Sequence, residues 1–287
     1  MKFIVSCKDV SKNFKNVEAL KKVSFNIEEN KIYGLLGRNG AGKTTLLNIL
    51  STNVIRNSGE VRIFGEEPFE NQKVLSSLCF INDTLPFLGF KVSEIFKISS
   101  MYYKNWDEKF KNDLVKKFDI NIKKRYMTLS KGTKAVIGII VGLASRSPLT
   151  IFDEAYSGLD AAARKIFYDT LREDHTENPR TIIFSTHLID EAAALFDNVI
   201  IIDEGNVLLS EETETITENF FEIVGNSQVY ERMKKDKKIL GVEDFGRLKK
   251  FRIFSSLSNE EIKELNSLGG ELKKGSLQEL FIHLTAK

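Results

Sequence analysis

Eight consecutive residues near the start of the chain carry the clearest chemical signal. They read Gly37-Arg38-Asn39-Gly40-Ala41-Gly42-Lys43-Thr44 and fit the pattern G-x-x-x-x-G-K-T. An apolar run, 31–36, precedes them, and a segment with helical spacing, 45–50, follows. This strand–loop–helix context is typical of a phosphate-binding loop, in which glycines let backbone N–H groups turn inward and the helix N-terminus attracts anions. The alternative, a glycine-rich turn before an ordinary helix, leaves the full pattern unexplained.

The end of this loop supplies groups that would act on phosphate. The Lys43 ammonium is expected to reach the outer phosphates of a bound triphosphate, and the Thr44 hydroxyl is expected to hold Mg²⁺. We therefore expect Lys43 to be catalytic and Thr44 to bind metal. The whole loop, together with Thr45, is expected to bind nucleotide.

Two acids follow an apolar segment, 149–152, in the middle of the chain. In a nucleotide hydrolase the first acid, Asp153, would orient Mg²⁺ and its waters. The second, Glu154, would accept a proton from the attacking water or orient that water. The alternative is a solvated acidic strand end, which the phosphate-binding loop upstream makes less attractive.

Four other residues fit a nucleotide site and equally fit ordinary structural roles. His187, one of three histidines, follows the apolar segment 181–186 and could contact a terminal phosphate or serve only in packing. Ser130 and Gly132 stand where a helix begins, and for that stretch alone a plain helix cap is the preferred interpretation. Phe14 fits a core position or a π face stacked on adenine.

Along the chain, the elements that would position these residues alternate between strands and helices. Strands are predicted at 78–81, 149–153, 181–186 and 198–203, with helices between them, which indicates a mainly parallel sheet. Ligands of such sheets bind at the carboxyl ends of the strands. Lys43, Asp153, Glu154 and His187 all lie just beyond such ends.

The remaining segments have a different character. Short strands are expected at 3–5 and 23–27, and helices without strands over 90–127. After a composition break at 203–206, a small α+β domain is predicted. A split β-α-β unit is one arrangement that fits its expected elements. Its expected elements are strands at 220–224 and 247–254 and helices at 227–236, 259–268 and 276–284. We expect domains at 1–210, with a helical subdomain at about 88–145, and at 211–287.

Composition limits the function classes. The chain has 287 residues, a net charge of +2 and an apolar fraction of 42%, which argues against nucleic-acid binding through bulk positive charge. Cys7 and Cys79 form neither a disulfide framework nor a zinc pattern, so a reducing cytosol is expected. The N-terminus lacks the pattern of a signal peptide, and the apolar runs are shorter than the ~20 residues of a membrane span.

Taken together, these motifs resemble those of an ABC-transporter ATP-binding subunit, over about residues 3–210. In that family's terms, 37–44 is the Walker A loop, 149–153 the Walker B strand, 129–133 the signature loop and 157–160 the D-loop. Glu154 matches the catalytic glutamate, His187 the switch histidine and Phe14 the adenine-stacking aromatic. The resemblance implies an α/β P-loop NTPase fold with a mainly parallel core sheet, an antiparallel β subdomain and a helical subdomain.

The resemblance also implies partners. Two such domains pair head to tail, as a homodimer or with a second ABC ATPase, and ATP lies between the Walker A loop of one copy and the signature loop of the other. Ser130 and Gly132 would then contact the γ-phosphate across the dimer, and Asp160 would belong to the nucleotide interface. A multi-spanning membrane permease is the implied partner, with the chain on the cytoplasmic face of the membrane. No nucleic acid is expected.

Four departures from the family pattern bear on activity. The signature reads Ser-Lys-Gly-Thr, which keeps Ser130 and Gly132. The position of the Q-loop glutamine holds Asp83, or Asn82 in a shifted register, and Asp83 is expected to touch Mg²⁺ or water. Ala-Tyr at 155–156 replaces the usual Pro-Thr, and the stacking aromatic is a phenylalanine. Because every catalytic residue type persists, ATP hydrolysis is expected.

Segments 152–164 and 180–191 resemble a bacterial branch, the Ytr-type and phenol-soluble-modulin-exporter-type subunits. That resemblance implies export of, or defence against, peptides, toxins or antibiotics. Two other functions remain open: a soluble ABC ATPase not coupled to transport, and a nucleotide-gated binding module with little turnover.

Overall fold

The computed structural model describes residues 3–82, 87 and 89–286. The chain divides into two compact units. The first comprises the residues up to His187 together with Ile200–Leu209, and the second comprises Leu188–Val199 together with the residues from Ser210 onward.

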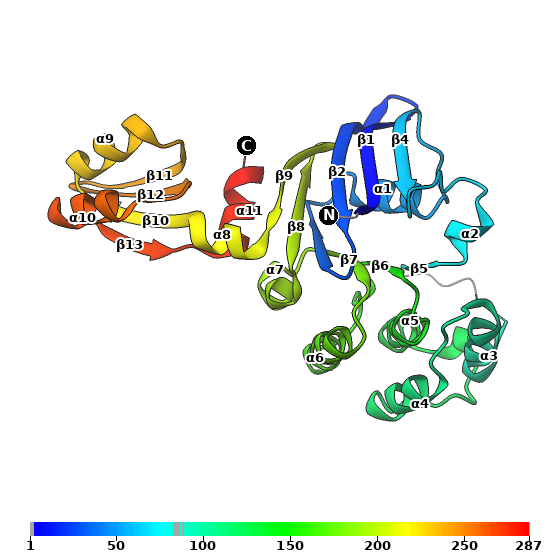
Figure 1. Cartoon of the computed structure of the whole chain (residues 1–287). Helices are drawn as coiled ribbons and strands as arrows, with labels where there is room; N and C mark the ends of the chain where they lie inside the picture. The colour runs from blue at the N-terminus through cyan, green and yellow to red at the C-terminus, as the bar shows by residue number, and fades with distance from the viewer. Residues whose placement is uncertain (1–2, 83–86, 88, 287) are drawn as a thin grey trace. The chain divides into compact units, whose positions relative to one another are not determined.

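A six-stranded sheet in the order β5-β6-β7-β3-β8-β9 contains the strands predicted to be parallel (Figure 1). Its strands are β3 (Ile32–Leu36), β5 (Leu78–Ile81), β6 (Leu149–Asp153), β7 (Thr181–Thr186), β8 (Asn198–Asp203) and β9 (Asn206–Glu212). The pairs β5–β6, β6–β7 and β7–β3 are parallel. Every residue of β3, β6 and β7 is buried, as expected for strands covered on both faces. The predicted mainly parallel sheet is confirmed.

The strand register places the carboxyl ends of β3, β6 and β7 at one edge of this sheet. Leu36, the last residue of β3, pairs with Thr186 of β7, and Asp153, the last residue of β6, pairs with Ser185. Because these strands are parallel and in step, the segments that leave their carboxyl ends begin side by side.

An antiparallel sheet of order β2-β1-β4 accompanies the parallel one. Its strands are β1 (Phe3–Phe14), β2 (Val17–Glu28) and β4 (Ser58–Ile63). The first two are much longer than the predicted 3–5 and 23–27, because backbone pairing continues through their polar ends. Helix α1 (Lys43–Leu50) packs between the sheets, and its Leu46 and Leu47 are fully buried in one core cluster with residues of both.

Three helices of the first unit, α3, α4 and α5, lie together at the lower right of Figure 1, with α6 beside α5. The helical elements of this unit are α2 (Gln72–Leu75), α3 (Val92–Tyr102), α4 (Glu108–Lys117), η1 (Tyr126–Thr128), α5 (Lys131–Ala144) and α6 (Ala161–Glu177). Helix α5 begins at Lys131, because the Ser130 hydroxyl accepts a hydrogen bond from the Thr133 N–H at 3.2 Å and caps the helix there.

The second unit contains an antiparallel sheet in the order β11-β12-β10-β13. The chain order β-α-β-β-α-β, with β12 between β10 and β11, is the split arrangement suggested by the sequence. Its elements are α7 (Ile189–Ala192), η2 (Ala193–Leu195), α8 (Thr213–Asn219), β10 (Phe220–Gly225), α9 (Ser227–Asp236), β11 (Ile239–Phe245), β12 (Leu248–Phe254), α10 (Asn259–Ser267), β13 (Glu271–Lys274) and α11 (Leu277–Thr285). Sequence patterns missed β11 and β13, which are edge strands without a buried alternating face.

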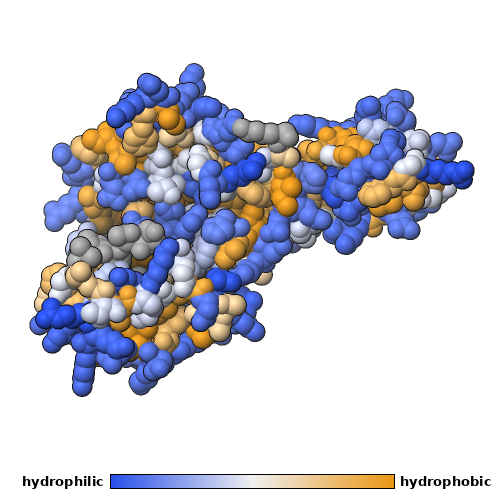
Figure 2. Space-filling view, turned by 180° about the vertical axis from the view of Figure 1, so that it is seen from behind, coloured by the Kyte–Doolittle hydropathy of each residue, from blue (hydrophilic) through white to orange (hydrophobic). Residues whose placement is uncertain are grey.

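The surface is predominantly polar on the face drawn in Figure 2, where hydrophobic side chains show in scattered patches. Among the helices of the described residues, none combines the length and apolar character needed to span a membrane. Cys7 and Cys79 are buried free thiols.

Candidate nucleotide-binding site

Two glycines give the 37–44 loop its shape. A Cβ atom on Gly37 would lie 2.5 Å from the Ile202 carbonyl oxygen, and one on Gly42 would lie 2.6 Å from the Ala19 carbonyl oxygen. Gly42 also has φ 107°, in a region that side chains with a Cβ rarely adopt. The close approach of neighbouring backbone therefore requires glycine at both positions.

Lys43 opens helix α1 and is held inside the loop. Its side chain is 5% exposed, and its ammonium donates to the carbonyl oxygens of Gly37 at 2.7 Å and Arg38 at 3.3 Å. Burial lowers the pKa of Lys43, while the carboxylates of Glu154 and Asp153 act in the opposite direction. The loop thus keeps a partly desolvated cation beside two acids.

Asp153 ends β6 as a buried carboxyl group. Burial raises its pKa, while the Ser185 and Thr44 hydroxyls act in the opposite direction. Its Oδ1 atom is buried and has no hydrogen-bond partner among the described residues. A carboxylate oxygen with spare capacity beside the Thr44 hydroxyl is a hard-oxygen donor set, so these residues fit Mg²⁺.

Glu154 connects the other two predicted catalytic residues. Its Oε1 lies 3.9 Å from Lys43 Nζ and 3.6 Å from His187 Nδ1. The backbone of Glu154 has φ 48°, a conformation uncommon for a residue other than glycine and one that turns the chain sharply after β6. The structure therefore brings Lys43, Glu154 and His187 together at the sheet edge where the sequence predicts them.

A cavity of about 420 Å³ lies over the loop. Its lining includes Val17, Glu18, Ala19, Lys21, Asn39, Gly40, Ala41, Gly42, Lys43, Thr44, Thr45, Glu154 and Glu204. No sequence motif marks Glu204 or the residues from β2, which reach the loop only through the tertiary fold. Arg38 is exposed and lies outside this lining.

Phe14, predicted to stack on adenine, stands at the end of β1. It pairs with Val17, which lines the cavity, although Phe14 itself does not. The ring is 46% exposed, and the Lys12 ammonium lies 4.9 Å from its centroid. Phe14 is therefore not a core residue, which removes one of the two interpretations left open, and its contact with adenine stays a prediction.

The signature loop and the D-loop line a second cavity in the same unit. Ser130, Gly132 and Asp160 line a cavity of about 660 Å³ that shares no lining residue with the cavity over the phosphate-binding loop. Ser130 caps α5, and the Asp160 carboxylate caps α6 by accepting from the Ala163 N–H at 2.8 Å. These three predicted nucleotide contacts are thus not gathered around the loop of their own chain.

Two contacts in this region involve residues at which the sequence departs from the family pattern. Lys131 of the signature loop donates from its ammonium to the Ser157 hydroxyl of the D-loop at 2.9 Å. Tyr156 hydrogen-bonds His187. The sequence marks both residues as departures from the family pattern. Asp83, the predicted metal contact, lies outside the described residues, whereas the alternative residue Asn82 lines a groove beside β5.

Known proteins resemble this chain over about three quarters of its length. The protein-family model described as "ABC transporter" matches residues 20–157. The chain is 33% identical to the putative ABC transporter ATP-binding protein AlbC of Bacillus subtilis, over 72% of this chain and 92% of that protein. It is 25% identical to the ABC transporter ATP-binding protein YtrB of the same organism, over 77% of this chain and 76% of that protein.

A third relative is named for its cargo. The bacitracin transport ATP-binding protein BcrA of Bacillus licheniformis is 31% identical, over 72% of this chain and 69% of that protein.

Solved structures show the same fold. An ATP-binding subunit of an ABC transporter superposes with a TM-score of 0.67 at 23% identity, over 74% of this chain and 91% of that chain. The dimeric, post-hydrolysis structure of the cassette MJ0796 bound to ADP and Pi superposes with a TM-score of 0.62 at 22% identity, over 73% of this chain and 98% of that chain. The chain belongs to the family of ABC transporter ATP-binding proteins, which are ATPases.

Proposed function

We propose that this chain is the ATP-hydrolysing subunit of a bacterial exporter of peptides, toxins or antibiotics, and that it acts on the cytoplasmic face of the membrane through a permease. The observation that carries the ATPase part is the convergence of Lys43, Glu154 and His187 at the mouth of the phosphate-binding loop. The named transport of bacitracin by the relative BcrA supports the cargo class.

In this proposal the loop binds the phosphates of ATP. The backbone of 37–44 and the α1 N-terminus face the phosphate oxygens, and Lys43 exchanges its bonds to the Gly37 and Arg38 carbonyls for the outer phosphates. Thr44 and Asp153 would hold Mg²⁺. The bound ion would neutralise charge that develops on the transferred phosphoryl group.

Glu154 is the proposed general base. The left-handed backbone directs it away from β6, and its side chain is 32% exposed, so a water molecule can reach the carboxylate. His187, which is adjacent to Glu154, would donate a hydrogen bond to the terminal phosphate. Lys43 and His187 therefore hold the phosphate on either side of the base.

A second copy, of this chain or of a related ATPase, would complete the site. Ser130, Gly132 and Asp160 line a separate cavity that shares no residue with the cavity over the loop of the same chain. The Ser130 hydroxyl and the α5 N-terminus form a donor surface suited to the γ-phosphate of a partner copy. The dimeric post-hydrolysis structure of MJ0796 supports this arrangement.

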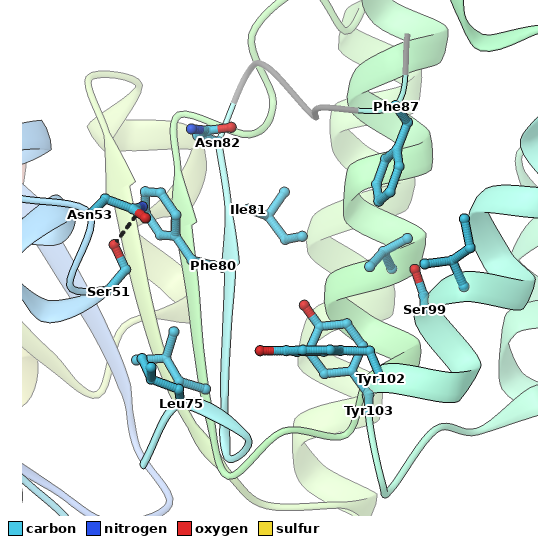
Figure 3. A pocket seen from close by; sticks show the side chains of 13 residues that line it. Ser51, Asn53, Leu75, Phe80, Ile81, Asn82, Phe87, Ser99, Tyr102 and Tyr103 are labelled. Carbon is cyan, nitrogen blue, oxygen red and sulfur yellow. Dashed lines mark hydrogen bonds between the residues drawn. The ribbon is translucent and has the colours of Figure 1, made fainter. Parts of the chain in front are cut away.

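A groove of about 440 Å³ is the proposed docking place for the permease (Figure 3). Its walls come from β5 and α2 on one side and from α3 and α5 on the other, with Leu75, Phe80, Ile81 and Tyr102 among the side chains that face it. Along α3, apolar side chains spaced three and four residues apart are exposed: Ile98, Met101 and Tyr102. Such a stripe suits the apolar face of a cytoplasmic helix of the membrane partner.

The test is co-purification of a tagged chain from detergent-solubilised membranes of its host, with mass spectrometry and an ATPase assay on the eluate. We expect a multi-spanning protein to co-purify, and Lys43→Ala to abolish ATP turnover. Ile98→Glu should release the partner, whereas Ile122→Glu should not, since Ile122 is also 38% exposed but does not line the groove.

The outcomes separate the parts of this proposal. A chain that hydrolyses ATP but brings only soluble proteins or ribosomes would overturn the transport assignment. Absence of turnover in the presence of the membrane partner would leave only a nucleotide-gated binding module.

A further inference from the structure

Tyr156 occupies a position next to the acidic pair where the family pattern has a threonine. Its side chain is 2% exposed, and its ring packs between two others, with centroid separations of 5.9 Å from Phe184 and 5.6 Å from His187. The ring is therefore fixed by the core of β7 and placed against the predicted catalytic histidine.

The Tyr156 hydroxyl makes two contacts with the same histidine. It accepts a hydrogen bond from the His187 backbone N–H at 3.0 Å, and it lies 2.9 Å from His187 Nδ1. The Thr186 hydroxyl also hydrogen-bonds Tyr156. The backbone and the ring of His187 thus both contact one buried oxygen, although the histidine side chain is 52% exposed.

The direction of the ring contact follows from donor and acceptor counting. A phenol carries one proton and can accept at its oxygen. The His187 backbone N–H can only donate and fills one acceptor position of the oxygen. The Thr186 hydroxyl donates to the other, which leaves the phenol proton for Nδ1. Burial raises the pKa of Tyr156, so the hydroxyl keeps this proton at neutral pH.

We propose that Tyr156 is a positioning residue for His187, whose hydroxyl donates to Nδ1 and keeps the ring proton on Nε2. In that tautomer Nε2–H can donate to a phosphate oxygen, whereas the opposite tautomer would present a lone pair to the phosphate. Nε2 has no hydrogen-bond partner in the part of the chain that the structure describes. This inference rests on the proposed contact between His187 and the terminal phosphate.

Tyr156→Phe removes the hydroxyl and keeps the packed ring. We expect kcat for ATP hydrolysis to fall about 10- to 100-fold, less than the 10²–10³ typical for loss of a whole transition-state donor, because the imidazole stays present but is no longer oriented. The KM for ATP should change less than about threefold, since the phosphate-binding loop is untouched.

A matched control is Tyr168→Phe. Tyr168 lies on α6, is 8% exposed and also packs on Phe184, at 6.0 Å, but has no contact with His187 among the described residues. The same chemical change there should leave kcat within about twofold of the unmodified protein.

A double-mutant cycle shows whether the effect passes through the histidine. In a His187→Ala background, Tyr156→Phe should lower kcat by no more than about twofold, because the group that it orients is gone. An undiminished loss in that background would overturn the proposal, since Tyr156 would then act on the fold or on another group.

Nitrogen-15 NMR of the imidazoles tests the tautomer without reference to catalysis. The sequence has three histidines, so His187 can be assigned by substitution. At a pH well above the usual imidazole pKa of about 6.5, His187 should show a protonated Nε2, and Tyr156→Phe should produce a mixture of tautomers. A protonated Nδ1 in the unmodified protein, or identical spectra in the variant, would refute the inference even if the ATPase proposal stands. Absence of ATP turnover with the expected tautomer would instead refute the proposed function alone.

Discussion

Gly132 is the residue at which a single methyl group tests the geometry of the signature loop. It is the second residue of α5, where alanine would ordinarily favour the helix by about 0.5–1 kcal/mol. A Cβ atom at this position, however, would lie 2.5 Å from the carbonyl oxygen of Gly158 in the D-loop, where ordinary contact begins at 3.4 Å. The substitution Gly132→Ala therefore requires the two loops to separate by about 0.9 Å.

This displacement is large on the scale of catalysis. Active groups need placement within about 0.5 Å, and a shift of about 1 Å can cost a factor of 10² in rate. We expect Gly132→Ala to lower kcat for ATP hydrolysis about 100-fold, which corresponds to about 2.7 kcal/mol of activation free energy. Overpacking should also offset the helix gain, so the free energy of unfolding should not rise.

Steady-state ATPase rates and urea unfolding of the same preparations measure both effects. Gly89→Ala is the control, because a Cβ atom there would meet no described atom within 4 Å, and it should change neither quantity appreciably. If Gly132→Ala kept full kcat and raised stability by about 1 kcal/mol, Gly132 would be an ordinary helical glycine and the argument from contact with the D-loop would be wrong.

Three further substitutions probe the site and its support. Glu154→Gln should lower kcat about 10²- to 10⁴-fold while ATP binding, measured by equilibrium titration, persists; a smaller loss would exclude a general base at this position. Asp153→Asn should raise the free energy of unfolding at neutral pH in the presence of EDTA and lower ATPase activity. Burial raises the pKa of Asp153 in the folded state above its usual value of 3.8. Between the unfolded-state and folded-state pKa values the folded protein binds more protons than the unfolded one, so stability should increase as the pH falls through that range. Asp174→Ala should lower the free energy of unfolding by about 3–5 kcal/mol in urea, because it leaves the guanidinium of Arg180, 5% exposed and 2.8 Å away, without its buried partner. Asp169→Ala on the same helix removes an exposed pair and should cost less than about 1 kcal/mol; equal losses would show that burial does not set the difference.

Local sequence patterns are sufficient to predict the site residues that directly follow a buried strand. The 37–44 loop, the acids at 153 and 154 and the histidine at 187 each follow a buried strand, and parallel pairing brings the ends of such strands to one edge. The sequence alone therefore predicts that Lys43, Glu154 and His187 converge.

Strand lengths and edge strands were less accessible. β1 and β2 continue through polar residues because they pair with each other, and β11 and β13 have no buried alternating face of their own. Such elements are stabilised by backbone hydrogen bonds to a neighbouring strand, and the pattern of their own side chains does not record that neighbour.

By itself, the sequence determined the phosphate-binding loop, the acidic pair and the alternating core, because glycine spacing and hydrophobic periodicity are local properties. Only the tertiary structure decided which residues surround them. It placed the Tyr156 hydroxyl on His187, the Lys131 ammonium on Ser157 and the Gly158 carbonyl against Gly132. These contacts join residues that are 26 or 31 positions apart in the chain, so their formation depends on how strands and helices pack, which no short pattern encodes.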